Sequence, residues 1–333
     1  MNMKKNISIM AFAAAAMLCC GCSDWTTPEN LNFHPQTPEQ KDPAAYAEYI
    51  NAVKAFKETE HNVMIVTMEG TSQYPSSQSQ HIMAMPDSAD YVCVKIEDNL
   101  HEVIAAEITA VLEKKGTKSL VYVDYAVIAE AWTALEDERA DKGEAPGTDE
   151  QLAAFFKEQA DLQLARCNEY GFAGVMVSFQ GTKVAGYAYN SQNAYMQAVK
   201  AFHEANPEKE LVFRGAARNV IDQEFLQEFK YIVIVAGEER KLSLLPGRVL
   251  GSSAPKDRVI MELTVPSADV PEQLGMSPAE AANWLWTEVE NTSFTPRGLC
   301  VENGHDDYFC KDMAFKNIRT AITILNTPPI VEE

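Results

Sequence analysis

Eight short apolar runs, most of them separated by helical stretches, constrain the fold of this chain more than any other feature. The runs lie near residues 62–68, 90–95, 118–124, 172–179, 210–214, 230–236, 258–264 and 298–302. Runs of this length predict buried strands, and the stretches between them, such as Leu100–Lys114 and Leu152–Tyr170, predict helices. We therefore predict an α/β fold, a single-domain (β/α)₈ TIM barrel, for which 333 residues are ample.

The residues before the first run do not belong to that barrel. Lys4 and Lys5 precede a short apolar stretch that closes on Gly21-Cys22 and resembles a bacterial lipoprotein signal. Cleavage after Gly21 would remove a signal peptide, residues 1–21, and leave Cys22 as an acylated first residue. The apolar stretch is too short to span a bilayer as a helix, so the lipid would be the only membrane attachment. A soluble secreted protein that is cut elsewhere is the alternative.

Residues 22–42 are predicted to form a flexible tether between the lipid and the barrel. This segment contains Pro28, Pro35 and Pro38, many polar residues and few apolar ones. Such a composition favours an extended linker. The barrel domain is then expected to span residues 43–333.

Charge and metal-ligand patterns exclude several classes of partner. The chain has 48 acidic and 28 basic residues, a net charge of −20, and no basic stretch of the kind that binds nucleic acid. Its histidines do not form a ligand cluster with a cysteine pair, so we predict neither a metal nor a cofactor. Cys300 and Cys310 could form a disulfide, which the sequence alone leaves open.

The fourth apolar run carries the most specific motif. Residues 171–180, GFAGVMVSFQ, resemble the fourth-strand signature of glycoside hydrolase family 18, which contains chitinases and endo-β-N-acetylglucosaminidases. In that family a Gly-Phe pair is followed by D-x-x-D-x-D-x-E, whose glutamate is catalytic. This chain has the Gly-Phe frame but none of the four acids, because the corresponding residues are Ala173, Met176, Ser178 and Gln180.

The missing acids bear on the chemistry that the resemblance implies. Family members use the substrate itself: the glutamate protonates the leaving oxygen while the N-acetyl carbonyl of the sugar attacks the anomeric carbon. The aspartate two residues earlier orients and stabilises that acetamido group. Gln180 has no proton that titrates near neutral pH, and general acid catalysis typically contributes about 10²–10⁴-fold. We therefore predict that none of the four positions is catalytic.

Three further segments resemble a subgroup of family-18-like lipoproteins. Residues 54–66, 86–92 and 317–328 resemble the opening, the second strand and the closing helix of that subgroup, in the same order. The resemblance thus covers roughly residues 43–328. Members of the subgroup resemble components of glycan-foraging systems in Gram-negative anaerobes, in which a lipoprotein captures oligosaccharide beside an outer-membrane transporter.

Residues that suit a sugar ligand lie at the predicted carboxyl ends of the strands, where (β/α)₈ barrels place their sites. They offer aromatic faces or hydrogen-bonding groups. The candidates are Tyr74, Asp124, Tyr125, Ser178, Gln180, Tyr187, Tyr189, Arg214, Glu238 and Asn303, with Tyr187 and Tyr189 in the loop after the fourth run. For each of them, a solvated loop or packing at the barrel mouth is the alternative.

These observations lead to three hypotheses. The first is an outer-membrane lipoprotein at the cell surface, whose non-catalytic barrel binds N-acetylglucosamine-containing glycans for an uptake system. The second is an active endo-β-N-acetylglucosaminidase-like or chitinase-like hydrolase with a relocated acid, such as Glu238 or Asp124. The third is a scaffold lipoprotein that binds a transporter or another protein through the outside of the barrel. We favour the first, because all four acids are missing.

Overall fold

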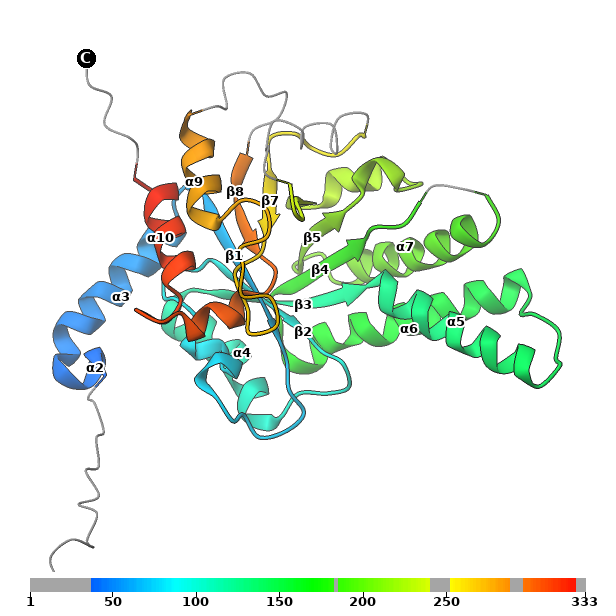
Figure 1. The fold of residues 1–333 in the computed structure, drawn as a ribbon, viewed down its shortest axis with the longest axis horizontal. Helices are drawn as coiled ribbons and strands as arrows, with labels where there is room; N and C mark the ends of the chain where they lie inside the picture. Colours follow the sequence, from blue (N-terminus) through cyan, green and yellow to red (C-terminus); the bar gives the residue numbers. More distant parts are fainter. Residues whose placement is uncertain (1–36, 183–184, 240–251, 288–295, 328–333) are drawn as a thin grey trace, which may run out of the picture. The chain divides into compact units, whose positions relative to one another are not determined.

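Eight buried strands form a closed parallel barrel (Figure 1). The computed structural model describes residues 37–182, 185–239, 252–287 and 296–327. The strands are β1 Val63–Glu69, β2 Tyr91–Lys95, β3 Lys118–Asp124, β4 Gly174–Phe179, β5 Glu210–Gly215, β6 Tyr231–Val235, β7 Val259–Leu263 and β8 Pro296–Val301. They pair in chain order, and β8 pairs with β1, which closes the sheet. Each strand begins and ends within two residues of a predicted run, so the (β/α)₈ prediction is confirmed.

Helices cover the outside of the barrel and connect the strands (Figure 1). They are α4 Glu102–Lys115, α5 Tyr125–Asp141, α6 Asp149–Tyr170, α7 Tyr187–Ala205 and α9 Pro278–Thr287, and α10 Lys316–Leu325 follows the last strand. Another helix, α3 Pro43–Lys57, precedes β1. Several connections contain short 3₁₀ helices, namely η1 Gln78–Gln80, η2 Ile82–Ala84, η3 Ala217–Asn219, η4 Phe225–Glu228 and η7 Gly304–Phe309. Within the described ranges, no helix combines the length and the apolar character that crossing a membrane requires.

The described residues before Glu48 form a unit of their own, separate from the barrel unit that starts there. Pro38–Lys41 forms a one-turn helix, α2, whose first amides are capped by the Thr37 side chain. The end of the predicted tether is therefore helical rather than extended. The predicted signal peptide, Cys22 and the rest of the tether lie outside the described residues.

The interior of the barrel changes from apolar to polar along the strands. One buried cluster is made of Val63, Ile65, Tyr91, Cys93, Leu120, Tyr122, Met176, Val212, Val233, Ile260 and Cys300. Because alternate residues of a strand share a face, the next inward position toward each carboxyl end is two residues further on. Those positions are Thr67, Lys95, Asp124, Ser178, Arg214, Val235, Glu262 and Glu302. The carboxyl end of the interior is thus predominantly polar.

The cysteines of the described residues are free thiols. Cys93 and Cys300 belong to the interior cluster, and Cys300 Sγ lies 3.8 Å from Thr67 Oγ1. Cys310 is only partly buried and follows η7. The disulfide between Cys300 and Cys310 that the sequence left open is therefore not formed.

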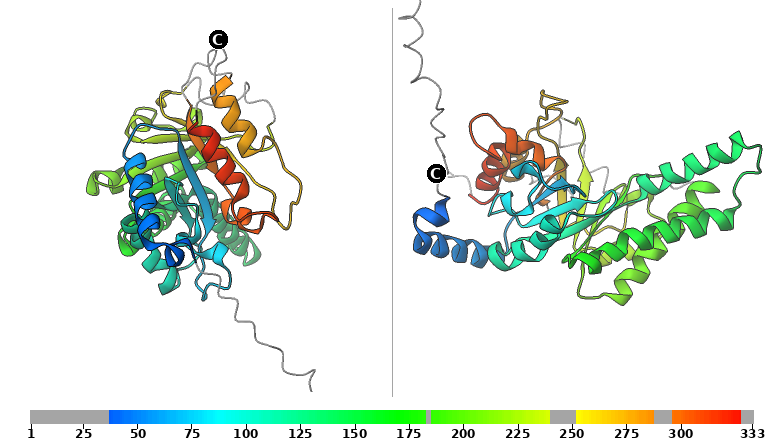
Figure 2. Two further views of the ribbon diagram at one scale, coloured as in Figure 1. Left: turned by 90° about the vertical axis from the view of Figure 1, so that its left-hand side faces the viewer. Right: turned by 90° about the horizontal axis from the view of Figure 1, so that it is seen from below.

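A helical hairpin projects beyond the carboxyl ends of the strands. α5 begins directly after β3, where the Asp124 side chain accepts a hydrogen bond from the Ala126 amide at 3.0 Å. α6 begins at a capping box between Thr148 and Gln151 and runs back along the barrel beside α7. In Figure 2 the tip of the α5–α6 hairpin is the part of the barrel unit furthest from the strands.

The Gly-Phe frame of the fourth strand has a structural role. Gly171 ends α6 in the left-handed conformation, with φ of 77°, which glycine adopts without a steric penalty. Phe172 is fully buried. A Cβ atom on Gly174 would lie 2.1 Å from the Glu210 carbonyl oxygen, so β4 can approach β5 this closely only with a glycine there. This frame therefore positions the strand independently of any catalytic residue.

We expect Gly174→Ala to lower the free energy of unfolding by about 3 kcal/mol or more, the upper end of overpacking costs. The added methyl group meets a backbone carbonyl, which cannot move unless β4 and β5 separate. Gly143→Ala is the control, because Gly143 has a φ of 70° but nothing within 4 Å of its Cβ position. That variant should lose only about 1 kcal/mol, from backbone strain. Equal losses in chemical denaturation would contradict this reading.

Candidate functional site

Side chains from three neighbouring strands meet inside the carboxyl end of the barrel. Ser178 of β4 is in register with Asp124 of β3 on one side and with Arg214 of β5 on the other. Arg214 Nη1 donates a hydrogen bond to Ser178 Oγ at 3.2 Å. Ser178 also forms a hydrogen bond with the Asp124 carboxyl. The position that holds a family aspartate thus carries a hydroxyl between a guanidinium and a carboxyl group.

A bidentate ion pair occupies the centre of this site. Arg214 Nε donates to Glu262 Oε2 at 2.5 Å, and Arg214 Nη2 donates to Glu262 Oε1 at 2.6 Å. Both residues are buried, with 7% and 3% of their surface exposed. Two parallel bonds of this kind match the planar fork of an arginine to a carboxylate. The pair therefore fixes the Arg214 side chain between β5 and β7.

A second ion pair adjoins the first. Lys95 Nζ lies 2.7 Å from Glu302 Oε1 and 3.2 Å from Glu69 Oε1. The other Glu302 oxygen, Oε2, lies 3.7 Å from Arg214 Nε and accepts no hydrogen bond from the described residues. Glu302 thus links the two cations into one network that spans β1, β2, β5, β7 and β8.

Tyr122 and Met176 lie beneath this network. The Tyr122 ring centroid is 5.5 Å from Lys95 Nζ and 5.8 Å from the guanidinium carbon of Arg214. Cations at such distances are attracted to the face of an aromatic ring. Met176 is fully buried in the apolar cluster one level below Ser178. An aromatic ring and a thioether therefore form the floor of the site.

The electrostatics of the site follow from burial and pairing. Burial raises the pKa of Glu262, and the Arg214 guanidinium opposes that shift. Burial lowers the pKa of Arg214, but Glu262 and Glu302 outweigh this effect and raise it above its ordinary value. Because an arginine keeps its proton in proteins, Arg214 favours the ionised form of the Glu262 carboxyl beside it. Burial also raises the pKa of Asp124.

The four positions of the missing acids do not lie together at the mouth of the barrel. Ala173 precedes β4, Met176 is buried in the core and Ser178 is bonded to Arg214. Gln180 follows the last residue of β4 and is exposed to solvent. Of the four, only Ser178 and Gln180 lie at the carboxyl end of β4, where a ligand could reach them.

Two predicted ligand residues occupy a different element from the one expected. Tyr187 and Tyr189 were predicted in a loop, but they lie on the first turn of α7, because that helix begins at Tyr187. They are 43% and 45% exposed. The Tyr187 ring packs edge-on against Phe156 of α6, with the centroids 6.2 Å apart. Both residues therefore start from a helix, and the Tyr187 ring is also held by its contact with α6.

The remaining predicted residues are dispersed. Tyr125 is buried, and its hydroxyl lies 2.8 Å from Ser191 Oγ of α7. Asn303 bonds both backbone groups of Val265 and thereby joins the connections after β7 and β8. Tyr74 and Glu238 are exposed. The geometry brings together Asp124, Ser178 and Arg214 and leaves the others at the periphery.

Lys95 and Glu262 are site residues that the sequence-based prediction does not include. Each is a charged residue within an apolar run, YVCVK at residues 91–95 and VIMEL at residues 259–263. Charged side chains are rarely buried without a partner. A charge in a buried strand therefore signals a partner on another strand, but the sequence does not identify that partner. Among the described residues, no group of histidine, cysteine and acidic side chains is arranged to hold a metal ion.

The amino-acid sequence matches a known family over more than half of its length. Residues 26–245 match the family model described as glycoside hydrolase family 18, BT1044-like. The matched region includes β4 and β5, and hence Ser178 and Arg214. No curated protein matches the sequence.

Solved structures of similar fold include several hydrolases. The apo endo-β-N-acetylglucosaminidase from Cordyceps militaris has a TM-score of 0.59 and 15% identity, over 84% of this chain and 96% of that one. A selenomethionine variant of BT1044 has a TM-score of 0.60 and 14% identity, over 88% and 96%. A protein described as putative chitinase A from Streptomyces coelicolor has a TM-score of 0.54 and 15% identity, over 80% and 99%. At these identities the likeness establishes the fold alone.

Arg214→Met should destabilise the protein by about 3–5 kcal/mol, because it leaves the Glu262 carboxylate buried without its partner. Arg214→Met/Glu262→Leu should recover most of that loss, since it leaves no unpaired charge in the same place. In the single variant, burial without Arg214 raises the folded-state pKa of Glu262 further above its unfolded value. The loss of unfolding free energy in Arg214→Met, relative to the wild type, should therefore be small at pH 5 and grow as the pH rises to 8. Urea denaturation at both pH values tests this, and a double variant no more stable than the single one would contradict it.

Proposed function

Because the chain belongs to the BT1044-like group of glycoside hydrolase family 18, we propose that it binds N-acetylglucosamine-containing glycans at the carboxyl end of its barrel without hydrolysing them. The chitinases and endo-β-N-acetylglucosaminidases of similar fold act on such sugars. One of them, from Cordyceps militaris, has been solved in complex with fucosyl-N-acetylglucosamine-Asn.

The observation that carries the proposal is the environment of Ser178. The family mechanism needs a carboxylate there, to stabilise the positive charge that develops on the acetamido group, and a proton donor two residues later. Here the hydroxyl of Ser178 contacts the Arg214 guanidinium, and the Gln180 amide cannot act as an acid near neutral pH. Glu262, the carboxylate on the other side of Arg214, is already matched by that guanidinium. The acid and the electrostatic stabiliser of the transition state are thus missing from their family positions on β4.

The same groups suit binding. The exposed Gln180 amide can both donate to and accept from an N-acetyl group, without the desolvation cost of a carboxylate. Tyr187 and Tyr189, on the first turn of α7, offer apolar ring faces for sugar C–H groups and hydroxyls for hydrogen bonds. Because Phe156 of α6 already packs against the Tyr187 ring, ordering that ring on binding costs little conformational entropy.

The proposal extends to the cellular role. A lipid on Cys22 would hold the protein on the outer membrane at the cell surface, and the barrel would pass captured oligosaccharide to a transporter of a glycan-uptake system. The support for this part is the lipoprotein-like sequence that ends at Cys22 and the resemblance to glycan-foraging lipoproteins.

The partly buried carboxyl group of Asp124 favours a second candidate function, that of a hydrolase with a relocated acid. Its carboxyl group has a pKa raised by burial, and it forms a hydrogen bond with Ser178 on the neighbouring strand. A carboxyl group of this kind can hold a proton for general acid catalysis. Glu238, the other relocated acid considered, is exposed after β6 and lacks these features.

The purified protein should release no product from chitin oligosaccharides or from N-glycans with a chitobiose core. Product analysis by mass spectrometry, with an active family member as positive control, measures this. Turnover that is abolished by Asp124→Asn would establish the relocated acid. Turnover that survives Asp124→Asn but is lost in Gln180→Ala would instead show that Gln180 has a catalytic role.

Glycan binding should weaken about 3–10-fold in Tyr187→Ala and in Tyr189→Ala, because each change removes one aromatic contact. Gln180→Ala should lower the affinity for acetylated sugars more than the affinity for deacetylated ones. Phe56→Ala is the control, since Phe56 is an exposed aromatic residue that contacts His61 rather than the carboxyl end. Calorimetry with chitin oligosaccharides and N-glycan cores provides the affinities. Unchanged affinity in all three site variants would move the site elsewhere, and no binding to any such glycan would favour the scaffold role.

A further inference from the structure

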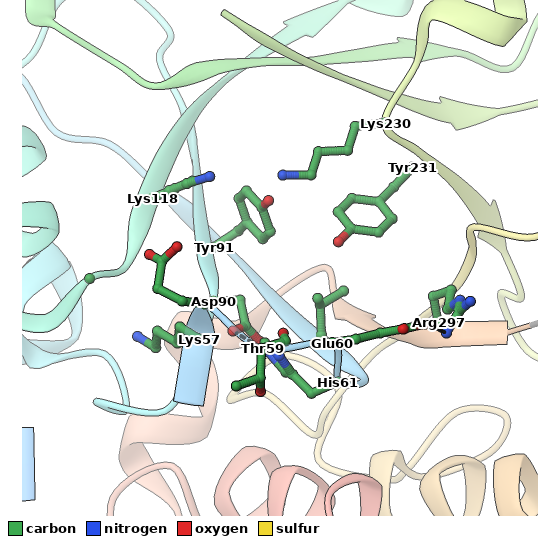
Figure 3. Close-up of a pocket in the computed structure, with 13 residues that line it drawn as sticks. Lys57, Thr59, Glu60, His61, Asp90, Tyr91, Lys118, Lys230, Tyr231 and Arg297 are labelled. Carbon is green, nitrogen blue, oxygen red and sulfur yellow. Dashed lines mark hydrogen bonds and ion pairs between the residues drawn. The ribbon is translucent and has the colours of Figure 1, made fainter. Parts of the chain in front are cut away.

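A cavity opens at the amino-terminal end of the barrel, opposite the carboxyl-terminal site (Figure 3). Its volume is about 320 Å³, at the lower end of small-molecule sites. It is lined by the first residues of several strands and by the connection before β1, including Tyr91, Lys118, Lys230, Tyr231 and Arg297. Such a cavity is separate from the carboxyl-terminal site, because the strands run the length of the barrel between them.

Two lysines in this cavity share one carboxylate. Lys118 Nζ lies 2.5 Å from Glu210 Oε1, and Lys230 Nζ lies 2.8 Å from the same oxygen. The Tyr91 hydroxyl donates to the other oxygen, Oε2, at 2.8 Å. The two lysines lower the pKa of Glu210 although burial opposes the shift, so the carboxylate is ionised. One negative charge therefore faces two positive charges, which leaves an excess of one positive charge.

The ammonium groups remain accessible to a ligand. The Lys118 and Lys230 side chains are 38% and 39% exposed, whereas that of Glu210 is 18% exposed. In Figure 3 the two lysines point toward one another across Tyr91. Each ammonium group has three donors, and the described structure gives each one a single acceptor, on Glu210. Several donors are thus free to bind an oxyanion that enters between them.

Most other charged groups of the lining have a partner. Lys57 Nζ donates to the Lys115 carbonyl at 3.1 Å and to the Thr117 hydroxyl at 2.7 Å, and Glu58 is exposed at the edge of the cavity. His61 Nε2 lies 2.8 Å from Asp90 Oδ1, and Arg297 Nη1 lies 2.7 Å from Glu60 Oε1. They line the cavity without competing for the lysines. Lys118 and Lys230 are thus two accessible cations that share one carboxylate, in a protein whose net charge of −20 repels anions elsewhere.

Two tyrosine rings form an apolar wall beside the lysines. The Tyr91 and Tyr231 centroids are 6.0 Å apart, with the ring planes inclined at 77°. Lys230 Nζ lies 5.7 Å from each centroid, so this ammonium group lies beside both rings. An oxyanion bound by Lys230 would therefore hold the rest of its molecule against these rings.

We propose that this cavity binds a small organic anion of the size of one sugar ring, whose carboxylate or phosphate lies between Lys118 and Lys230. The tyrosines contact the ring, and Glu210 holds the two ammonium groups in place. This site is independent of glycan binding at the carboxyl end, so the two proposals stand or fall separately.

Calorimetric titration of the full chain with glucuronate, glucose 6-phosphate and glucose tests the proposal. We expect both anions to bind and the tighter one to identify the preferred group, while neutral glucose at the same concentration produces no binding heat. Because the interaction is ionic and solvent-accessible, affinity should fall as salt rises from about 20 to 200 mM. No binding by either anion, or equal binding by glucose, would overturn the proposal.

Two variants with opposite expected effects separate a ligand site from a structural cluster. Lys230→Gln should weaken anion binding about tenfold or more, the cost of one charged hydrogen bond, while Lys118 and Tyr91 still satisfy Glu210. Glu210→Gln should strengthen it, because the competing carboxylate disappears. Lys200→Gln is the matched control, a lysine of 41% exposure that pairs with Asp222 on the outside of the barrel. Unchanged binding in Lys230→Gln, or weaker binding in Glu210→Gln, would contradict the assignment.

Discussion

The Arg214–Glu262 ion pair is the interaction on which the carboxyl half of the barrel interior depends. A closed eight-stranded barrel is narrow enough that side chains must fill it, and here seven of the eight inward positions at that level are polar. Each of them would be costly to bury alone. The bidentate pair satisfies two of the largest, and it leaves Arg214 a third donor for Ser178. Lys95 of β2 and Glu302, which follows β8, form a second ion pair that satisfies two more of these polar positions.

This arrangement explains how a family strand can keep its frame after it has lost its acids. Gly171, Phe172 and Gly174 serve the end of α6, the core and the contact between β4 and β5. These tasks are set by backbone geometry and packing, so they persist whatever the chemistry at Ser178 and Gln180. The four acids are not needed for this packing. Arg214 of the neighbouring strand β5 instead bonds Ser178, at the position of one of them.

The two ends of the barrel treat charge differently. At the carboxyl end the buried Arg214 and the partly buried Lys95 are matched by Glu262 and Glu302, so the cations there are paired. At the amino end Lys118 and Lys230 share Glu210 and stay accessible to solvent. Neutral glycans suit the first environment and a small anion suits the second. One barrel can therefore hold two sites without interference between their charges.

The amino-acid sequence by itself determined the barrel, the strand boundaries within two residues and the absence of the four acids, because these depend on local periodicity and on residue identity. It also brought forward Asp124 and Arg214, which end predicted strands, and Ser178, which occupies a position of the family motif. Only the tertiary structure paired Lys95 and Glu262 with partners from other strands, and only it placed Tyr187 on a helix. Lys118, Lys230 and Glu210 come together for the same reason: contacts between residues far apart in sequence are set by barrel closure and strand register, which no local pattern encodes.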